Sequence, residues 1–500
     1  MATMMEFSSA QLDPLSSAAI QEDLPGAQAA FNADAMRDYL QAALFGPAGA
    51  GYTIERCEPG QSVYTGDSCI VRYPLEVKDS LSGQVIQPLV VGRVFPNQPA
   101  ATQYLRDKLA PLADRMRGRA EIAPFRTPVA LIEPLNMVVY VFPIDGELPV
   151  LVDVTDPEKM RVLLGEMLRE NLDSNLTVQD CRVELGHYGR RHRCVLRYHI
   201  TATSPGDATP QQLLVYGKIA ADDRGALAGP VIDALHAQVL DGNKGYQFNI
   251  PRSFGFRPNL QLALFEAIPG VPQVAQLLKA RLKGQAATQP GQLSLEASID
   301  ACAKIAAALH TSGISLGPRR TLADELAGLR KGFAGVQHIA PELGAQFQSW
   351  LEQVEAYAAS SNSLDLCFSH GDFSYTQLIF EGTQTGLVDF DTVCQAEPAL
   401  DLGQFLAYVR MAVQKARKSA APAPAGLTEQ LCEQFFQSYI AASGDQLADA
   451  DLLRARVPVY ELISLLRLAL HSWQKLKGSR LEFVLTILEE RVSCLPQQSN

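Results

Sequence analysis

Alternating apolar and polar positions in the middle of the chain predict an antiparallel sheet. The two kinds of residue alternate along Cys194–Ala202 (CVLRYHITA) and Gln212–Ala220 (QLLVYGKIA), which is the period of a strand with one buried face. A helix and a strand are predicted before this pair, and a helix and two strands after it, near Glu158–Asn171, Cys181–Leu185, Gly229–Leu240, Ser253–Phe256 and Gln261–Ala267. This order predicts an α+β unit, an antiparallel meander with one helix inside it.

The first part of the chain repeats this unit. CIVRYPLEV aligns with CVLRYHITA, and QPLVVGRVFPN aligns with QLLVYGKIAAD. Matching residues lie 125 positions apart at Cys69/Cys194, Arg72/Arg197, Tyr73/Tyr198 and Gly92/Gly217, and 124 apart at Met36/Met160, Cys57/Cys181 and Gly146/Gly270. Matches over more than a hundred residues with a drift of one position predict a duplicated domain, not a short solenoid repeat.

The C-terminal part has a helical pattern instead. Apolar residues recur at three- and four-residue spacing in Leu427–Ala442, Ala450–Lys475 and Glu482–Arg491, which predicts amphipathic helices. We therefore predict three parts: residues 1–156, 157–268 and 269–500. Tyr460, Glu461 and Trp473 either line an acceptor pocket or belong to the helical core, and the core interpretation is favoured for most of these positions.

The chemistry is concentrated in Leu364–Gly403. LDLCFS, TQLIFE and GLVDF read as three short strands, and EGTQT reads as a hairpin loop. If this hairpin is symmetric about Thr383, Gln377 and Asp389 become opposed cross-strand neighbours, with Asp372 just before the open end. Phosphoryl transfer needs a carboxylate to orient the acceptor hydroxyl and oxygen ligands to hold Mg²⁺ against nucleotide phosphates. The segment therefore predicts a metal and phosphate site.

At these residues the chain resembles the aminoglycoside phosphotransferase/choline kinase family, small-molecule kinases that share the protein-kinase fold. The resemblance rests on His370-Gly371-Asp372 followed by Gln377, on Leu387-Val388-Asp389, and on the segment EPALDL at 397–402. It implies a bilobal fold, an antiparallel-sheet N-lobe and a mainly helical C-lobe, here preceded by a second, degenerate N-lobe-like domain.

The resemblance also implies roles for single residues. Asp372 would be the catalytic base, Asp389 the principal Mg²⁺ ligand, and Asp401 a structural residue that ties the loop down. His370 would brace the catalytic loop by hydrogen bonding. His310, at the end of an amphipathic helix, is expected to be a structural cap or an interface residue, not a catalytic one.

Gln377 departs from the family pattern, which usually has Asn at this position. Gln offers the same carbonyl oxygen on a side chain one methylene longer, and Mg²⁺ demands near-ideal octahedral geometry. We interpret the pattern as an H-G-D-F-x-x-x-Q variant in which Gln377 is still a metal ligand. Asp391 projects to the same face as Asp389 if the strand persists, and is a further candidate metal ligand.

In the N-lobe, Lys218 in the third strand would hold the nucleotide phosphates. Its counterpart in the first copy is Arg93, and a guanidinium cannot simply replace a compact ammonium at a tight phosphate site. The first copy is therefore predicted to be catalytically degenerate. Asp233 is the best candidate for the carboxylate that a kinase lysine pairs with.

Two further segments are candidates for nucleotide contacts. Gly186, Gly189 and Arg190 lie in a loop that either covers phosphates, through backbone N–H groups and a guanidinium, or is a solvated turn. Glu266 and Ala267 resemble the hinge that pairs with adenine in this family, with a plain strand-to-helix connection as the alternative.

Composition narrows the class of protein. The chain has 500 residues, 47% of them apolar and 19% charged, as in ordinary globular proteins. The net charge of −11 argues against nucleic acid or an anionic membrane as a partner, and no apolar run reaches the length of a membrane span. Nine cysteines without a CxxC pair, and a start without a signal-peptide pattern, predict reduced thiols and a cytoplasmic location.

We therefore expect an ATP- and Mg²⁺-dependent phosphotransferase acting on a hydroxyl of a sugar, amino sugar or amino alcohol, with a homodimer possible. A pseudokinase or nucleotide-sensing regulatory protein is the alternative, which Gln377 and the degenerate domain favour somewhat. A protein kinase is disfavoured because no segment of activation-loop length separates Asp389 from Glu397. The first domain has no C-lobe of its own, so its apolar strands are expected to pack on the second N-lobe or on another copy of the chain.

Overall fold

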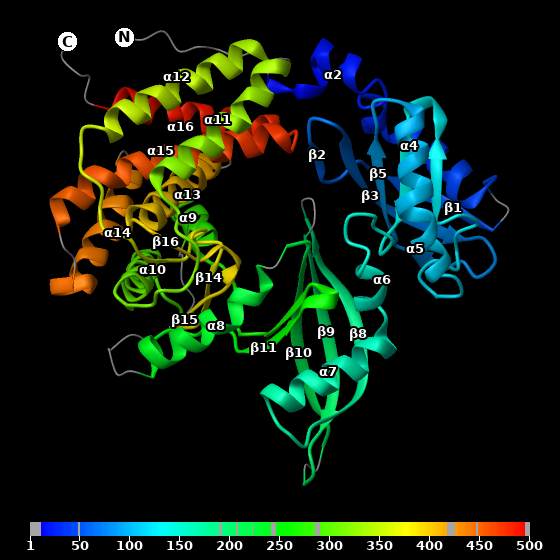
Figure 1. The fold of residues 1–500 in the computed structure, drawn as a ribbon, viewed down its shortest axis with the longest axis horizontal. Coiled ribbons are helices and arrows are strands. Elements are labelled where there is room, and N and C mark those ends of the chain that lie inside the picture. The colour runs from blue at the N-terminus through cyan, green and yellow to red at the C-terminus, as the bar shows by residue number, and fades with distance from the viewer. Residues whose placement is uncertain are drawn as a thin grey trace.

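The computed structural model describes residues 12–48, 51–189, 193–206, 209–222, 224–241, 247–285, 291–417, 426–446 and 449–495. The chain forms two sheet-containing parts and one mainly helical part (Figure 1). Within the described residues, no helix combines the length and the apolar character that a membrane span requires.

The first part contains a seven-stranded sheet. Its main path runs β1 (Tyr52–Cys57), β3 (Cys69–Asp79), β5 (Leu89–Val94), β7 (Met137–Val141) and β6 (Val129–Ile132), while β2 (Ser62–Tyr64) and β4 (Val85–Ile86) both pair with β3. The helices of this part are α2 (Ala18–Asp23), α3 (Ala33–Leu40), α4 (Gln98–Tyr104), α5 (Ala110–Arg115) and α6 (Leu151–Val154).

The second part contains a five-stranded sheet of the same strand order. Its path runs β8 (Thr177–Tyr188), β9 (Arg193–Thr203), β10 (Gln211–Ala220), β12 (Leu262–Glu266) and β11 (Ser253–Arg257), with the helices α7 (Pro157–Asn171) and α8 (Gly225–Leu235). The predicted strands and helices of this part are confirmed to within a few residues at each end. An antiparallel meander with one inserted helix follows from the period-2 patterns in both parts.

The two sheets also share their register. Arg93 on β5 pairs with Ile70 and with Val138. Lys218 on β10 pairs with Val195 and Ala263, and each of these residues lies 125 positions after its counterpart. The sequence alignment therefore corresponds to the same position in the two sheets.

A tyrosine–glycine pair explains part of the repeated sequence. A Cβ atom at Gly217 would lie 2.5 Å from the ring of Tyr198, and one at Gly92 would lie 3.1 Å from the ring of Tyr73. Both tyrosines are fully buried, and a buried hydroxyl needs a hydrogen-bond partner. The Tyr73 hydroxyl donates to the carbonyl of Ala30 at 2.7 Å, and that of Tyr198 donates to the carbonyl of Val154 at 2.9 Å. The glycine on one strand thus makes room for the ring on the next.

The third part is mainly helical. Its helices are α9 (Val274–Leu282), α10 (Leu295–His310), α11 (Leu322–Ile339), α12 (Pro341–Ala358), α13 (Ala399–Arg417), α14 (Leu427–Ser443), α15 (Ala450–Gln474) and α16 (Gly478–Ser493). Two short strand pairs join them, β13 (Cys367–Ser369) with β16 (Cys394–Ala396), and β14 (Leu378–Glu381) with β15 (Gln384–Leu387). Tyr460, Glu461 and Trp473 are each at most 2% exposed, which confirms the core interpretation for all three.

The first part packs on both of the others. Toward the second part, the Tyr188 hydroxyl donates to the carboxylate of Asp145, and apolar residues of the two sheets share one core. Toward the helical part, the Ser17 hydroxyl donates to the carbonyl of Ile339 at 2.8 Å, and the rings of Tyr64 and Trp473 meet edge to face. The apolar strands of the first domain are therefore covered within the same chain, by the second domain as expected and by the helical part in addition.

We predict that Gly217→Ala destabilises the protein by about 1–3 kcal/mol, because the added methyl group would overlap the Tyr198 ring in a filled core. Gly328→Ala on α11 is the matched control, since its Cβ would meet no atom within 4 Å and alanine favours the helix by roughly 0.5–1 kcal/mol. Chemical denaturation of both variants measures the difference. Equal or higher stability of Gly217→Ala would contradict this account of the repeat.

Candidate functional site

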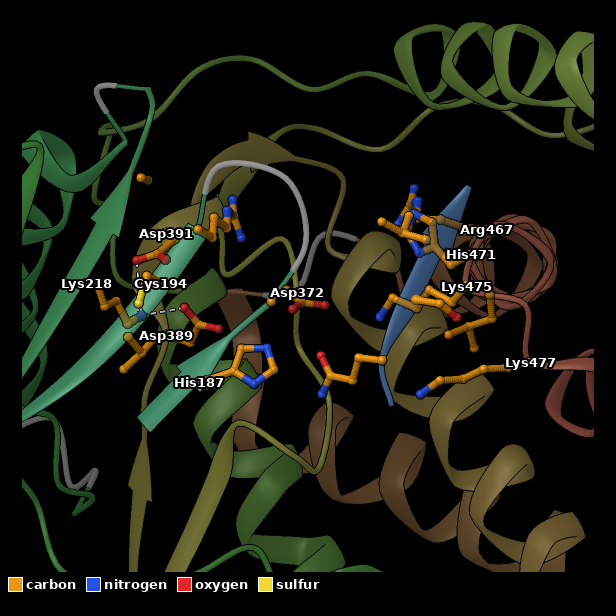
Figure 2. Close-up of a pocket in the computed structure, with 18 of the residues that line it drawn as sticks. His187, Cys194, Lys218, Asp372, Asp389, Asp391, Arg467, His471, Lys475 and Lys477 are labelled. Carbon is orange, nitrogen blue, oxygen red and sulfur yellow. Dashed lines mark hydrogen bonds and ion pairs between the residues drawn. The ribbon is translucent and has the colours of Figure 1, made fainter. Parts of the chain in front are cut away.

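A cavity of about 520 Å³ lies where the three parts of the chain meet (Figure 2). Lys218 enters it from the second part, and Asp372, Asp389 and Asp391 enter it from the helical part. The first part contributes the β2 residues Ser62 and Val63, together with Gln61 and Arg72. Side chains from distant stretches of the sequence therefore converge in one place.

Lys218 is held by two carboxylates. Its Nζ atom lies 2.5 Å from Oδ1 of Asp389 and 3.1 Å from Oδ1 of Asp391. Burial works against the ammonium charge, but Asp389 and then Asp391 outweigh it and raise the pKa of Lys218. Asp233 lies exposed on α8, and among the described residues the ion pairs of Lys218 are with the other two aspartates. The expected pairing of Lys218 with Asp233 is therefore wrong in this structure.

The pKa values of the two aspartates are shifted in opposite directions. Burial alone would raise the pKa of Asp389, but the Lys218 ammonium outweighs burial and lowers it. For Asp391 burial dominates, reinforced by the charge of Asp389, so the pKa of Asp391 is raised in spite of Lys218. A second cation beside Asp391 would stabilise the ionised form of this carboxyl and so lower its pKa.

The hairpin before Asp389 has a different register from the expected one. Glu381 pairs with Gln384 and Leu378 with Leu387, so the loop has only two residues and Gln377 opposes Val388. The backbone of Gly382 has φ +60°, which suits a tight two-residue turn. The prediction of symmetry about Thr383, and with it the cross-strand pairing of Gln377 with Asp389, is wrong by one residue.

The strand ends before Asp389, and this changes how the site is built. Asp389 has φ 73° and ψ 58°, the left-handed conformation, and Phe390–Thr392 form a 3₁₀ turn. Asp391 therefore reaches Lys218 through this turn and not by strand alternation. A left-handed non-glycine residue is strained and persists only where its surroundings hold it. Here the Lys218 ion pair holds the carboxylate.

Asp372 is oriented by two amides. The Gln404 amide donates to Oδ1 of Asp372, and the Gln377 amide donates to Oδ2 at 3.4 Å. Burial, and to a lesser degree the charge of Asp389, raise the pKa of Asp372 although His370 and the amides oppose the change. Gln404 was missed by sequence reasoning. The sequence feature that could have indicated Gln404 is its spacing of three residues from Asp401, which places both side chains on one face of α13.

Asp401 fixes the loop that carries Asp372. Its Oδ2 accepts from the backbone N–H of His370 at 2.7 Å, and its Oδ1 accepts from the N–H of Gly371 at 2.8 Å. His310 Nε2 lies 3.2 Å from the same carboxylate, and its other ring nitrogen lies 2.9 Å from the Tyr439 hydroxyl. Burial works to raise the pKa of Asp401, but the hydrogen bond with His310 and the other contacts lower it below the ordinary value.

His370 is fully buried and spans the loop. Its Nε2 lies 3.1 Å from the carbonyl of Val388, and its own carbonyl accepts from the Thr392 hydroxyl at 3.1 Å. These bonds join the loop before Asp372 to the segment that carries Asp389. The geometry is that of a brace between the two aspartates.

The remaining predicted site residues lie in different places. Gly189 lines the cavity, and Gly186 sits at a bulge of β8. Arg190 lies outside the described residues. Glu266 and Ala267, at the end of β12, are not among the residues that line the cavity, and the N–H of Ala267 donates to the carbonyl of Leu214 at 3.3 Å.

Asp389 and Asp391 are the residues that could hold a metal ion. No cluster of three or more His, Cys, Asp or Glu side chains suited to a metal occurs among the residues that the structure describes. Mg²⁺ commonly takes only one or two carboxylates and completes its shell with waters and substrate phosphates. The two aspartates, which already share one cation in Lys218, fit such a site.

The far end of the cavity is lined by cations that sequence reasoning did not single out as a site. In Figure 2, Arg467, His471, Lys475 and Lys477 lie together across the cavity from Lys218, Asp389 and Asp391, and Asp372 lies between the two groups. These four residues come from α15 and the turn after it. Helical spacing of four residues, from Arg467 to His471 and on to Lys475, was the signal available in the sequence.

Comparison with known proteins identifies the family of the C-terminal region. The profile described as "APH: Phosphotransferase enzyme family" matches residues 237–453. No curated protein sequence matches the chain.

Solved structures of phosphotransferases align with about two thirds of the chain. A choline kinase from Cryptosporidium parvum Iowa II is 13% identical, with 66% of this chain and 95% of that one covered and a TM-score of 0.42. A GDP complex of aminoglycoside 2'-phosphotransferase-IIIa is 14% identical (67% and 98% covered, TM-score 0.41). A glucosamine kinase is 15% identical (64% and 94% covered, TM-score 0.43).

We predict that Asp401→Asn lowers the free energy of unfolding at pH 7 by about 1–3 kcal/mol, because one amide oxygen replaces the carboxylate that three donors share. The pKa of Asp401 is lower in the folded protein than the roughly 3.9 of an unfolded chain. Its contribution is therefore present above about pH 4 and is lost as the pH falls through the folded value.

Denaturation of the wild type and the variant across pH measures this difference, which should shrink in acid. The exposed Asp365→Asn is the control and should follow the wild type at every pH. Identical midpoints for the wild type and Asp401→Asn at pH 7 would contradict the assigned role.

Proposed function

Residues 237–453 belong to the phosphotransferase enzyme family, and from this we propose that the protein is a kinase that transfers the γ-phosphoryl group of ATP to a hydroxyl of a small molecule. One observation supports this most strongly: Lys218, Asp389, Asp391 and Asp372 line one cavity between the two lobes. Phosphoryl transfer requires a cation that binds the phosphates, carboxylates that bind a metal ion and a further carboxylate that accepts the hydroxyl proton.

Asp372 is the proposed catalytic base. The acceptor hydroxyl gives its proton to the Asp372 carboxylate as its oxygen bonds to the γ-phosphorus, and the bond from that phosphorus to the bridging oxygen breaks, leaving ADP. The amides of Gln404 and Gln377 hold the carboxylate in one orientation. Burial raises the pKa of Asp372, which makes it a stronger base than an exposed aspartate.

Lys218 is the proposed phosphate ligand, and Asp389, with Asp391, is the proposed metal ligand. These carboxylates would hold a Mg²⁺ ion, which would supply positive charge that neutralises nucleotide phosphates. Gln377 was expected to be a metal ligand. Its amide nitrogen faces Asp372, so we propose that it orients the base, with its carbonyl oxygen left for the metal.

The first domain is proposed to be a duplicated N-lobe that has lost its phosphate site. At the position of Lys218 it carries Arg93, which is 9% exposed and forms an ion pair with Glu147 at 2.7 Å. The Arg93 guanidinium also lies 4.8 Å from the centre of the Tyr104 ring. In these contacts the Arg93 guanidinium stabilises the packing of the first domain. This supports a structural role for the domain, and not a role in binding phosphate.

A cytoplasmic location is part of the proposal. All nine cysteines are free, and burial raises the pKa of several of them, that of Cys57 to about 11. Such thiols suit a reducing compartment. A homodimer is not needed to cover the first domain, because the chain itself covers it.

A regulatory nucleotide-binding protein is the second candidate. The observation that favours it is the lysine's pairing, since Lys218 contacts the two aspartates and no glutamate among the described residues. A coupled assay of ADP release with a panel of sugars, amino sugars and amino alcohols separates the two. Turnover with any acceptor supports the kinase, and Mg²⁺·ATP binding without turnover supports the regulator.

We predict that Asp372→Asn lowers kcat about 10²–10⁴-fold, the usual effect of removing a positioned base. ATP affinity should stay within about twofold of the wild type, since the residue faces the acceptor. The ADP-release assay and nucleotide calorimetry give the two values, and Asp365→Asn serves as the control. Wild-type turnover by Asp372→Asn would remove this residue from the mechanism.

Lys218→Ala and Arg93→Ala form a matched pair at equivalent sheet positions. We predict that the first weakens ATP binding at least about tenfold, because charge-assisted bonds to phosphate are lost. The second should leave ATP binding unchanged and lower thermal stability, because the ion pair between Arg93 and Glu147 is lost. Calorimetry and thermal melts measure both. Equal effects of the two variants on ATP binding would show that the first domain retains a phosphate site.

A further inference from the structure

The cavity is lined in part by uncharged polar side chains. They come from all three parts of the chain and include Gln61 and Ser62 of the first domain, Gln404 and Tyr408 of α13, and Ser464 of α15. Of their polar groups, the proposed kinase chemistry uses only the amide nitrogen of Gln404, which orients the base. The other groups are available to a compound bound beside Asp372.

Two of these side chains are buried and have a polar atom without a partner. Gln404 is 4% exposed and Ser464 is 3% exposed. In the part of the chain that the structure describes, neither Oε1 of Gln404 nor Oγ of Ser464 has a hydrogen-bond partner. Buried polar groups are nearly always hydrogen-bonded, because a bond left unmade is costly. A ligand in the cavity would supply the missing partners.

The two side chains come from the place where α13 and α15 meet. A Cβ atom at Gly403 would lie 2.5 Å from the backbone nitrogen of Glu461 and 2.6 Å from the backbone carbon of Tyr460, so the two helices are in close contact here. Gln404 follows Gly403 directly, and Ser464 lies about one helical turn after Tyr460. The contact therefore brings Gln404 and Ser464 to neighbouring positions in the cavity wall.

Gln404 joins this wall to the proposed base. Its amide nitrogen donates to Oδ1 of Asp372. An ionised carboxylate only accepts hydrogen bonds, so the nitrogen faces Asp372 and the amide oxygen points elsewhere. Nitrogen and oxygen are bonded to the same carbon atom. A group that binds the oxygen is therefore close enough to a hydroxyl bound at Asp372 for both to belong to one small molecule.

A hydroxyl group fits both unpartnered atoms. The Gln404 oxygen only accepts, whereas the Ser464 hydroxyl donates or accepts, so one hydroxyl can donate to Gln404 and accept from Ser464. An ammonium group can donate to both, but a cation in a buried site needs a carboxylate partner. Among the described residues that line the cavity, the carboxylates are Asp372, Asp389 and Asp391. Each of them already has a partner, Lys218 or Gln404, which favours a neutral ligand.

We propose that the acceptor is a neutral polyhydroxy compound, a sugar or a cyclic polyol, and that Gln404 and Ser464 bind a second hydroxyl near the one that is phosphorylated. The first hydroxyl gives its proton to Asp372. The second donates to Oε1 of Gln404 and accepts from Oγ of Ser464. The inference rests on the proposed function for the role of this compound as acceptor, and it goes further by naming two residues that select polyols over amino alcohols.

The test is calorimetric titration of D-glucose, D-ribose and myo-inositol, with and without Mg²⁺ and a saturating non-hydrolysable ATP analogue. Ser464→Ala is the test variant. Ser472→Ala is the matched control, because it removes another buried hydroxyl of α15, one that donates to the carbonyl of Leu468 at 2.7 Å and is not among the groups that line the cavity.

We expect at least one of the three compounds to bind the wild type and the control alike. Ser464→Ala should bind that compound at least about threefold more weakly, with unchanged affinity for the analogue. Its thermal stability should not fall, because the hydroxyl that it removes forms no hydrogen bond with the described residues. Gln404→Leu should weaken binding of the same compound, and it decides the test if Ser464→Ala does not fold.

Absence of binding for all three compounds, or equal binding by the wild type and Ser464→Ala, would overturn the inference. In the ADP-release assay the three polyols should be turned over in preference to glucosamine, ethanolamine and choline, and the opposite preference would also overturn it. A failure of the proposed function is seen separately, as absence of analogue binding or of turnover with every acceptor. The titrations without the analogue then still decide whether the cavity binds a polyol.

Discussion

The ion pair of Lys218 with Asp389 and Asp391 is the constraint around which the site is organised. It joins a strand of the second domain to the turn that follows β15, and so fixes the two lobes against each other. One ammonium faces two partly buried carboxylates, and the pKa of Asp389 is lowered while that of Asp391 is raised. The left-handed backbone at Asp389 and the His370 brace position the carboxylates for this pair. A nucleotide and its metal ion would thus meet charged side chains that are already in position.

The first domain repeats the sheet of the second domain but has an arginine, Arg93, at the position of Lys218. The sheet keeps its strand order, its register and its tyrosine–glycine pair, because each depends on packing inside the domain. At the Lys218 position an arginine binds a glutamate and an aromatic ring instead. The segment after β1 also differs from the corresponding segment of the second domain. It forms the short strand β2, and this strand carries Ser62 and Val63 to the edge of the cavity.

Patterns that depend on local sequence were predictable, and contacts that depend on docking were not. Strands such as β9 and β10 follow from period-2 alternation, and their shared register follows from a repeat of constant spacing. The sequence order of His370, Asp372, Asp389 and Asp401 indicated one site. The hairpin register failed because Gly382 permits a two-residue loop, a choice that strand patterns do not reveal. Arg72 and the α15 cations were missed because their meeting depends on how three separately folded parts pack together.

Contact of the first domain with both lobes has a consequence for the motions of the molecule. In a two-lobed protein, opening the cleft requires a change at the connection between the lobes alone. Here the Tyr188 hydroxyl donates a hydrogen bond to Asp145 on one side, and Tyr64 packs on Trp473 on the other. The first domain therefore connects the second domain to the helical part by a second route. Widening the cleft must break one of these two contact areas as well. A wider cleft therefore requires partial detachment of a domain that carries none of the proposed catalytic residues.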